Sequence, residues 1–251
     1  MKEVLALIEK KKQELTQLPF FTFLEDTSVD PMQRLSWAPA FAFFAMDFKD
    51  FNRCVLRKEP ATTKIQEMIN AHSYEDGRHW VWFLQDIKLL GLNYPMNFTD
   101  TLKFLWGEET QKVRQFSHNL FAMCTFEDDI LMKLVMIESI EAMGYVFSFA
   151  TAQVTKELQQ ITKKHYPYFG ESHHAVEQGH IQVDGDIDNV ENFLESMQLT
   201  EEQEKKAVIM VNKVFADFTD VCNEMVVFTQ KHSYYQPFAK VSNIKPMVKY
   251  A

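Results

Sequence analysis

The sequence has few of the residues that make a chain turn. Its 251 residues include only 7 glycines and 8 prolines. All-β proteins and glycine-rich nucleotide-binding folds need many tight turns, so this scarcity argues against both. A chain with few breakers forms few, long elements, and 46% apolar residues suffice to bury a full core. We therefore predict an all-α protein, a bundle of six to eight helices.

Cysteine is scarce as well, and positive charge is not in excess. The three cysteines lie far apart without a CxxC motif, so neither a disulfide framework nor a thiolate zinc site is indicated. The net charge of −9 argues against a nucleic-acid partner, because binding phosphates requires clustered Lys and Arg.

Long uncharged apolar runs are also absent. No run approaches the ~18 residues that a membrane span requires, and the charged N-terminus is unlike a signal peptide. We expect a cytoplasmic protein without a membrane partner. No linker composition occurs, so one helical domain is predicted over residues 1–251, with its core at about 15–232 and an irregular tail at 233–251. Because aromatic-rich helical chains of this kind often pair across a two-fold axis, a homodimer is expected.

The spacing of apolar residues follows the period of a helix along most of the chain. Proline, glycine and the Tyr166-Pro167 dipeptide mark the breaks between helices. The predicted helices cover residues 2–17, 30–58, 62–90, 99–122, 126–164, 170–182, 186–197 and 200–231.

Histidines and carboxylates, in contrast, gather in two short windows. One reads HSYEDGRH over residues 72–79, and the other reads HHAVEQGH over residues 173–180. Both contain the spacing His-x3-(Asp/Glu)-x2-His, which chance is unlikely to repeat. On a helix, positions i, i+4 and i+7 fall within roughly 60° of one face, so two imidazoles and a carboxylate point the same way. The candidate ligands are His72, Asp76 and His79 with Glu75 as a second carboxylate, and His173, Glu177 and His180.

A third segment supplies further carboxylates. Glu138 and Glu141 are spaced i, i+3 within the apolar stretch 135–144. A carboxylate buried among Met, Ile and Val is costly unless it is paired or bound to a metal. Mixed imidazole and carboxylate ligands suit iron or manganese better than calcium, which prefers oxygen alone. The sequence therefore predicts a metal site built from three segments. The other histidines are interpreted as core residues (His118, His165 and His232) or as a surface residue (His174).

These segments resemble those of the heme-oxygenase-like diiron oxidases, relatives of the thiaminase and pyrroloquinoline-quinone synthase families. The resemblance covers about residues 15–232 and implies a heme-oxygenase-like bundle, two iron ions, and O2-dependent oxidation of a small organic substrate. Some members carry a carboxylate where this chain has His72, so His72 is either a ligand or a hydrogen-bond partner of Asp76. The matching residues are His173, Glu177 and His180 in the last cluster, His79 with Asp76 or Glu75 in the first, and Glu141 in the middle helix.

Other functions of the same fold stay open at this point. A heme oxygenase proper would need a proximal histidine on the first helices, and none occurs before His72. A thiaminase-like enzyme would need an activated cysteine, but neither Cys124 nor Cys222 has a histidine within a helical turn. A cofactorless oxidase would use the same cavity residues for proton transfer. A non-catalytic metal-binding protein is the remaining alternative.

Overall fold

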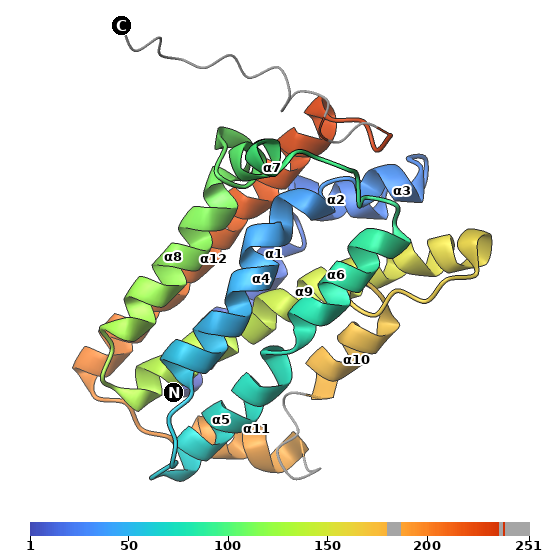
Figure 1. Ribbon diagram of the computed structural model, residues 1–251. Helices are drawn as coiled ribbons and strands as arrows, with labels where there is room; N and C mark the ends of the chain where they lie inside the picture. Colours follow the sequence, from blue (N-terminus) through green and yellow to red (C-terminus); the bar gives the residue numbers. More distant parts are fainter. Residues whose placement is uncertain (180–186, 236–237, 239–251) are drawn as a thin grey trace, which may run out of the picture.

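Long helices packed side by side form the protein (Figure 1). The computed structural model describes residues 1–179, 187–235 and 238, with the side chains of 177–179 and 187–191 left aside. All regular structure in that part is helical, so the predicted fold class is confirmed. The α-helices are α1 (Lys2–Leu15), α2 (Pro19–Glu25), α3 (Pro31–Arg34), α4 (Ala42–Phe51), α5 (Lys64–Asp76), α6 (His79–Leu89), α7 (Phe98–Leu105), α8 (Gln111–Thr125), α9 (Ile130–Thr162), α10 (Glu171–Gly179), α11 (Ile187–Ser196) and α12 (Glu201–Lys231).

Several predicted long helices are interrupted, so the described helices outnumber the predicted six to eight. The predicted helix 30–58 consists of α3, a 3-10 turn, α4 and a π-helical turn at Asn52–Leu56. The predicted helix 62–90 breaks at Gly77 into α5 and α6. A Cβ on residue 77 would lie 2.9 Å from the carbonyl oxygen of Ser73, closer than side chains normally approach. Glycine therefore permits the break that ends α5 at Asp76 and begins α6 at His79.

Side-chain caps mark the starts of two long helices. Thr200 and Gln203 form a reciprocal capping box at the start of α12, where the helix was predicted to begin. Asp129 accepts a hydrogen bond from the backbone N–H of Leu131 and caps α9, which begins at Ile130 rather than at the predicted residue 126. These caps satisfy N–H groups that have no partner within the helix, which is why the helices begin there.

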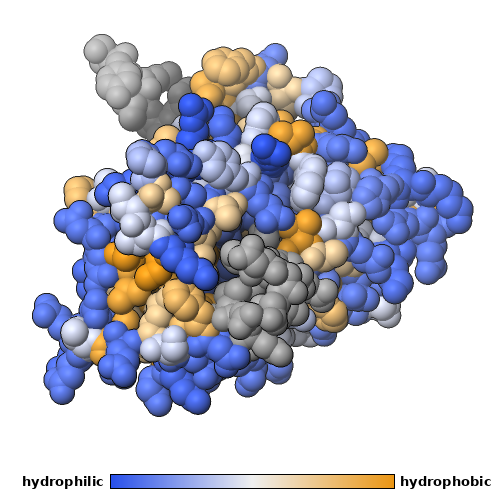
Figure 2. All heavy atoms as spheres, turned by 90° about the horizontal axis from the view of Figure 1, so that it is seen from below, coloured by the Kyte–Doolittle hydropathy of each residue, from blue (hydrophilic) through white to orange (hydrophobic). Residues whose placement is uncertain are grey.

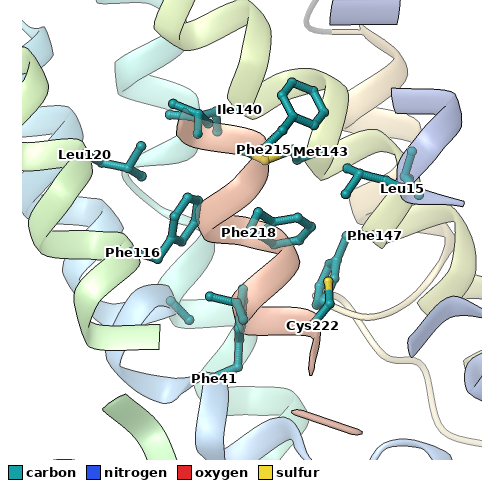
Figure 3. Close-up of a cluster of buried hydrophobic side chains, with 14 of the residues drawn as sticks. Leu15, Phe41, Phe116, Leu120, Ile140, Met143, Phe147, Phe215, Phe218 and Cys222 are labelled. Atoms are coloured by element: carbon teal, nitrogen blue, oxygen red, sulfur yellow. The ribbon is translucent and has the colours of Figure 1, made fainter. Parts of the chain in front are cut away.

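The 33-residue helix α9 is the central element of the bundle. It packs against α1, α2, α5, α10 and α12, and its buried residues occur around most of its circumference. Phenylalanines from four elements meet beside it: Phe41, Phe116, Phe147 and Phe218 point toward one another in Figure 3. A large part of the core therefore lies between α8, α9, α12 and the 3-10 turn that precedes α4.

A tight turn returns the chain from α9 to α10. Tyr166, Tyr168 and Phe169 are buried in this turn. A Cβ on Gly170 would collide with the carbonyl oxygen of Tyr166, so only glycine allows the chain to turn here. As a result α10 packs on α9, on the side where α5 and α6 also lie (Figure 1).

The surface bears on two of the expectations about partners. No helix in the described part of the chain is long and apolar enough to cross a membrane. Hydrophilic residues predominate on the face shown in Figure 2, where apolar residues form a patch at the lower left.

The homodimer stays a prediction. The predicted irregular tail at 233–251 lies largely outside the described residues.

Candidate metal centre

Three of the predicted ligands lie together where α5 meets α9. Nε2 of His72 is 3.0 Å from Oδ2 of Asp76, and Nδ1 of His72 is 3.3 Å from Oε1 of Glu141. One donor atom from each of the three residues lies within 4.8 Å of the others. Two ligands bound at about 2.1 Å to one ion stand about 3 Å apart at a right angle and about 4.2 Å apart when opposed. The group therefore has nearly the dimensions of a coordination sphere.

Two further histidines extend this group toward α10. Nδ1 of His79 is 3.6 Å from Oδ1 of Asp76, and Nε2 of His173 is 3.2 Å from Nδ1 of His79. The two oxygens of Asp76 thus face different histidines, Oδ2 toward His72 and Oδ1 toward His79. Asp76 stands between two groups of nitrogen donors.

His173 is held in the orientation that a metal ligand requires. Its Nδ1–H donates to the carbonyl oxygen of Tyr168 at 2.8 Å, because a carbonyl can only accept. In the neutral ring this leaves the lone pair on Nε2, the nitrogen that faces His79. Metal-binding histidines usually donate their other N–H to a carbonyl or carboxylate in this way. Aromatic rings hold both imidazoles: Trp82 stacks on His79 and Tyr168 on His173, each with centroids 4.8 Å apart.

Asp86 holds the turn that contains Tyr168, whose carbonyl orients His173. Its Oδ2 accepts hydrogen bonds from the backbone N–H groups of Tyr168 at 3.0 Å and Phe169 at 2.8 Å. The side chain is fully buried. Burial raises the pKa of Asp86 to about 7, opposed by the N–H groups of Phe169 and Tyr168 and by the nearby His173. Sequence analysis missed Asp86, although it lies two helical turns after His79, on the same face.

The structure brings together five of the predicted ligands: His72, Asp76, His79, Glu141 and His173. Asp76, His79 and His173 are buried, and His72 and Glu141 are partly exposed. Glu75 is exposed. Glu138 lies one turn before Glu141 on α9 and is half-buried. The side chain of Glu177 and the whole of His180 lie outside the described residues, so their roles stay predictions.

The remaining histidines differ in part from their interpretation as core or surface residues. His232 is buried as expected, with Nε2 2.8 Å from Oε2 of Glu109. His118 and His165 are exposed, so placing them in the core was wrong. His174 on α10 is half-buried, and its Nδ1 lies 3.0 Å from Oγ of Ser148 on α9.

Glu138 gives the metal-free protein a pH dependence that can be measured. Burial raises the pKa of Glu138 to about 7, and the nearby His72 opposes the rise. A carboxyl whose pKa is higher in the folded than in the unfolded state stabilises the fold fully below its unfolded pKa. This stabilisation is lost as the pH rises through the folded pKa. Stability should therefore fall between about pH 5 and about pH 8, and Glu138→Gln should reduce the fall by about 2 kcal/mol.

Urea unfolding at the two pH values in the presence of a chelator measures this effect. The exposed Glu67 on α5 provides the control, since Glu67→Gln should leave the fall of stability between the two pH values unchanged. If stability falls as much in Glu138→Gln as in the parent, Glu138 ionises normally in the folded protein.

A cavity of about 60 Å³ adjoins the donor group. Its polar lining consists of Asp76, His79, Glu141, Tyr168 and His173, and six phenylalanines make up much of the rest. The phenylalanines are Phe41, Phe44, Phe48, Phe116, Phe147 and Phe218. The candidate ligands thus stand at the wall of a largely apolar chamber.

The arrangement of the helices matches a solved structure. A crystal structure of a domain of unknown function with a heme oxygenase-like fold, from Shewanella denitrificans OS217, superimposes with a TM-score of 0.60 over 91% of both chains. This chain has a heme oxygenase-like fold. The two sequences are 14% identical, so the likeness concerns the fold alone. Neither a protein-family model nor a curated protein sequence matches the chain. The fold implied by the family resemblance is confirmed, and the diiron oxidase function stays a prediction.

Proposed function

We propose that this protein is a non-heme iron oxidase or oxygenase that uses O2 to oxidise a small organic substrate. The supporting observation is the convergence of His72, Asp76, His79, Glu141 and His173 beside an apolar cavity. Two imidazoles or more with carboxylates suit Fe(II), and manganese is the alternative metal. Bound iron would supply the electrons that activate O2.

The donor atoms fall into two groups that share Asp76. His72, Asp76 and Glu141 are the candidate ligands of one ion. His79 and His173, with the other oxygen of Asp76, are the candidate ligands of a second ion. Glu177 and His180 are predicted to complete the second group. Crowded carboxylates repel one another without a cation, which favours binding of at least one ion here.

The surrounding residues would act by orientation and by exclusion of water. The Tyr168 carbonyl and the Trp82 ring fix the two imidazoles of the second group. The phenylalanines of the cavity keep bulk water from the donor atoms and leave room for an apolar substrate. These features support oxidation in a dry site.

The cysteines disfavour the thiaminase-like alternative. Burial raises the pKa of Cys124 to about 12 and also raises the pKa of Cys222. Both thiols are protonated at neutral pH, and a thiol must ionise to act as a nucleophile. Neither residue lines the cavity.

The direct test is anaerobic loading with Fe(II), followed by exposure to O2. We expect about two iron ions per chain by metal analysis and a new visible absorbance when O2 is added. An iron store or scaffold would bind iron but would give no new visible absorbance when O2 is added. A chain that binds no iron after loading, or one whose metal-free form reacts as well as the loaded form, would refute the proposal.

A further inference from the structure

The cavity has two chemically distinct parts. Asp76, His79, Glu141 and His173 are linked by the short contacts described above. The phenylalanines form a second, continuous group, with Phe44 stacked 5.0 Å from Phe116 and 5.2 Å from Phe48. Phe41, Phe147 and Phe218 extend this aromatic wall across the bundle, as Figure 3 shows. A molecule in the cavity would have one end at the donor group and the remainder against phenylalanine rings.

The phenylalanine part of the cavity offers nothing to a charged group. Among the described residues that line the cavity there is no Lys or Arg to pair with a carboxylate or phosphate. Its polar side chains all lie at the donor group or beside it. Burying an unpaired charge or polar group is costly. A charged group of the occupant would therefore lie at the donor group and its proposed metal ions, and the part against the phenylalanines is uncharged.

The size of the cavity limits the shape of the occupant. A cavity of about 150 Å³ holds a benzene ring, whereas this one measures about 60 Å³. A water-sized group needs about 10–15 Å³ on the same kind of measure, so about four to six such groups fit. A short unbranched chain fills this space, and a ring does not enter it without movement of the walls.

We propose that the substrate presents an uncharged, unbranched aliphatic group of about four to six carbons to the cavity. Its end would lie beside Asp76 and Glu141. This inference rests on the proposed function, since it names the substrate class of the same site. It also predicts binding that requires no oxidation.

Binding of 1-pentanol to the zinc-loaded and metal-free proteins, measured by calorimetry without O2, tests the inference. We expect 1-pentanol to bind both forms at least about 10-fold more tightly than benzyl alcohol, because the ring does not enter the cavity. Ala45 is buried and lines the cavity, so Ala45→Leu should fill the space and weaken 1-pentanol binding at least about 10-fold. Ala42 on the same helix does not line the cavity, and Ala42→Leu should retain binding.

A variant with a larger cavity keeps the test decisive if Ala45→Leu does not fold. Phe44→Ala removes one aromatic wall, so benzyl alcohol should gain affinity for this variant. Tighter binding of benzyl alcohol than of 1-pentanol by the parent protein, or parental 1-pentanol binding by Ala45→Leu, would overturn the inference. Because zinc cannot activate O2, these results do not depend on the oxidase. If 1-pentanol binds but iron-loaded protein is inert toward O2, the proposed function fails; if iron reacts but 1-pentanol does not bind, the substrate class fails.

Discussion

Asp76→Ala should abolish tight binding of both metal ions, whereas Glu141→Ala should abolish binding of only one. The difference follows from the contacts of Asp76, whose two oxygens face His72 at 3.0 Å and His79 at 3.6 Å. Glu141 lies with the first of these histidines, its Oε1 3.3 Å from Nδ1 of His72. Loss of a direct ligand should lower the affinity for the affected ion by about 100-fold or more, since loss of a supporting residue alone lowers metal affinity by 10–100-fold. Metal analysis after anaerobic Fe(II) loading and desalting measures both effects.

Glu67 is an exposed carboxylate on the same helix, so Glu67→Ala is the matched control and should bind iron like the parent. His72→Ala answers the question that the sequence leaves open. If His72 is a ligand, one ion per chain is lost; if it only supports Asp76, both ions stay but bind about 10–100-fold more weakly. Parental iron content in Asp76→Ala would show that the centre drawn here is wrong.

Asp86→Ala should unfold far more readily than the parent and should bind metal weakly. The substitution leaves the backbone N–H groups of Tyr168 and Phe169 buried without their acceptor, which should cost about 2–5 kcal/mol of unfolding free energy. It also frees the turn whose carbonyl accepts the Nδ1–H of His173, so metal affinity should fall about 10–100-fold. Urea unfolding of the metal-free protein and competition with a chelator measure the two effects.

Asp86→Asn separates hydrogen bonding from charge. The amide oxygen can accept the same two hydrogen bonds, so this variant should keep most of the stability and most of the metal affinity. If Asp86→Asn loses as much metal affinity as Asp86→Ala, the charge of Asp86 matters, and the positioning role proposed for its hydrogen bonds is contradicted.

Some features of this protein follow from local sequence. Few glycines and prolines, together with the period of the apolar residues, lead to an all-α chain because backbone breakers and side-chain periodicity act over short distances. The boundary at Thr200 was predictable for the same reason, since a cap bonds to N–H groups within its own first turn. The repeated histidine and carboxylate spacing is equally local, and it identified four of the five residues that the structure groups together; the fifth, Glu141, came from the pair of glutamates in the apolar stretch 135–144.

Other features depend on contacts between segments that are distant in the sequence. Regular helical spacing places Asp76 and His79 on one uninterrupted helix, but Gly77 breaks that helix and gives each residue its own helix end. Glu75 and Asp76 are equally plausible from the sequence, and only the packing of α5 against α9 buries Asp76 and leaves Glu75 exposed.

The support of His173 and the cavity are likewise tertiary properties. Asp86 and Tyr168 are hydrogen-bonded although they are 82 residues apart in the sequence, and no periodic pattern predicts that contact. The cavity arises where phenylalanines of α4, α8, α9 and α12 meet incompletely, which depends on the angles and distances between those helices. The sequence by itself determined the helices and the types of donor that they carry; the tertiary structure decided which donors meet and what space lies beside them, because both depend on how the helices pack.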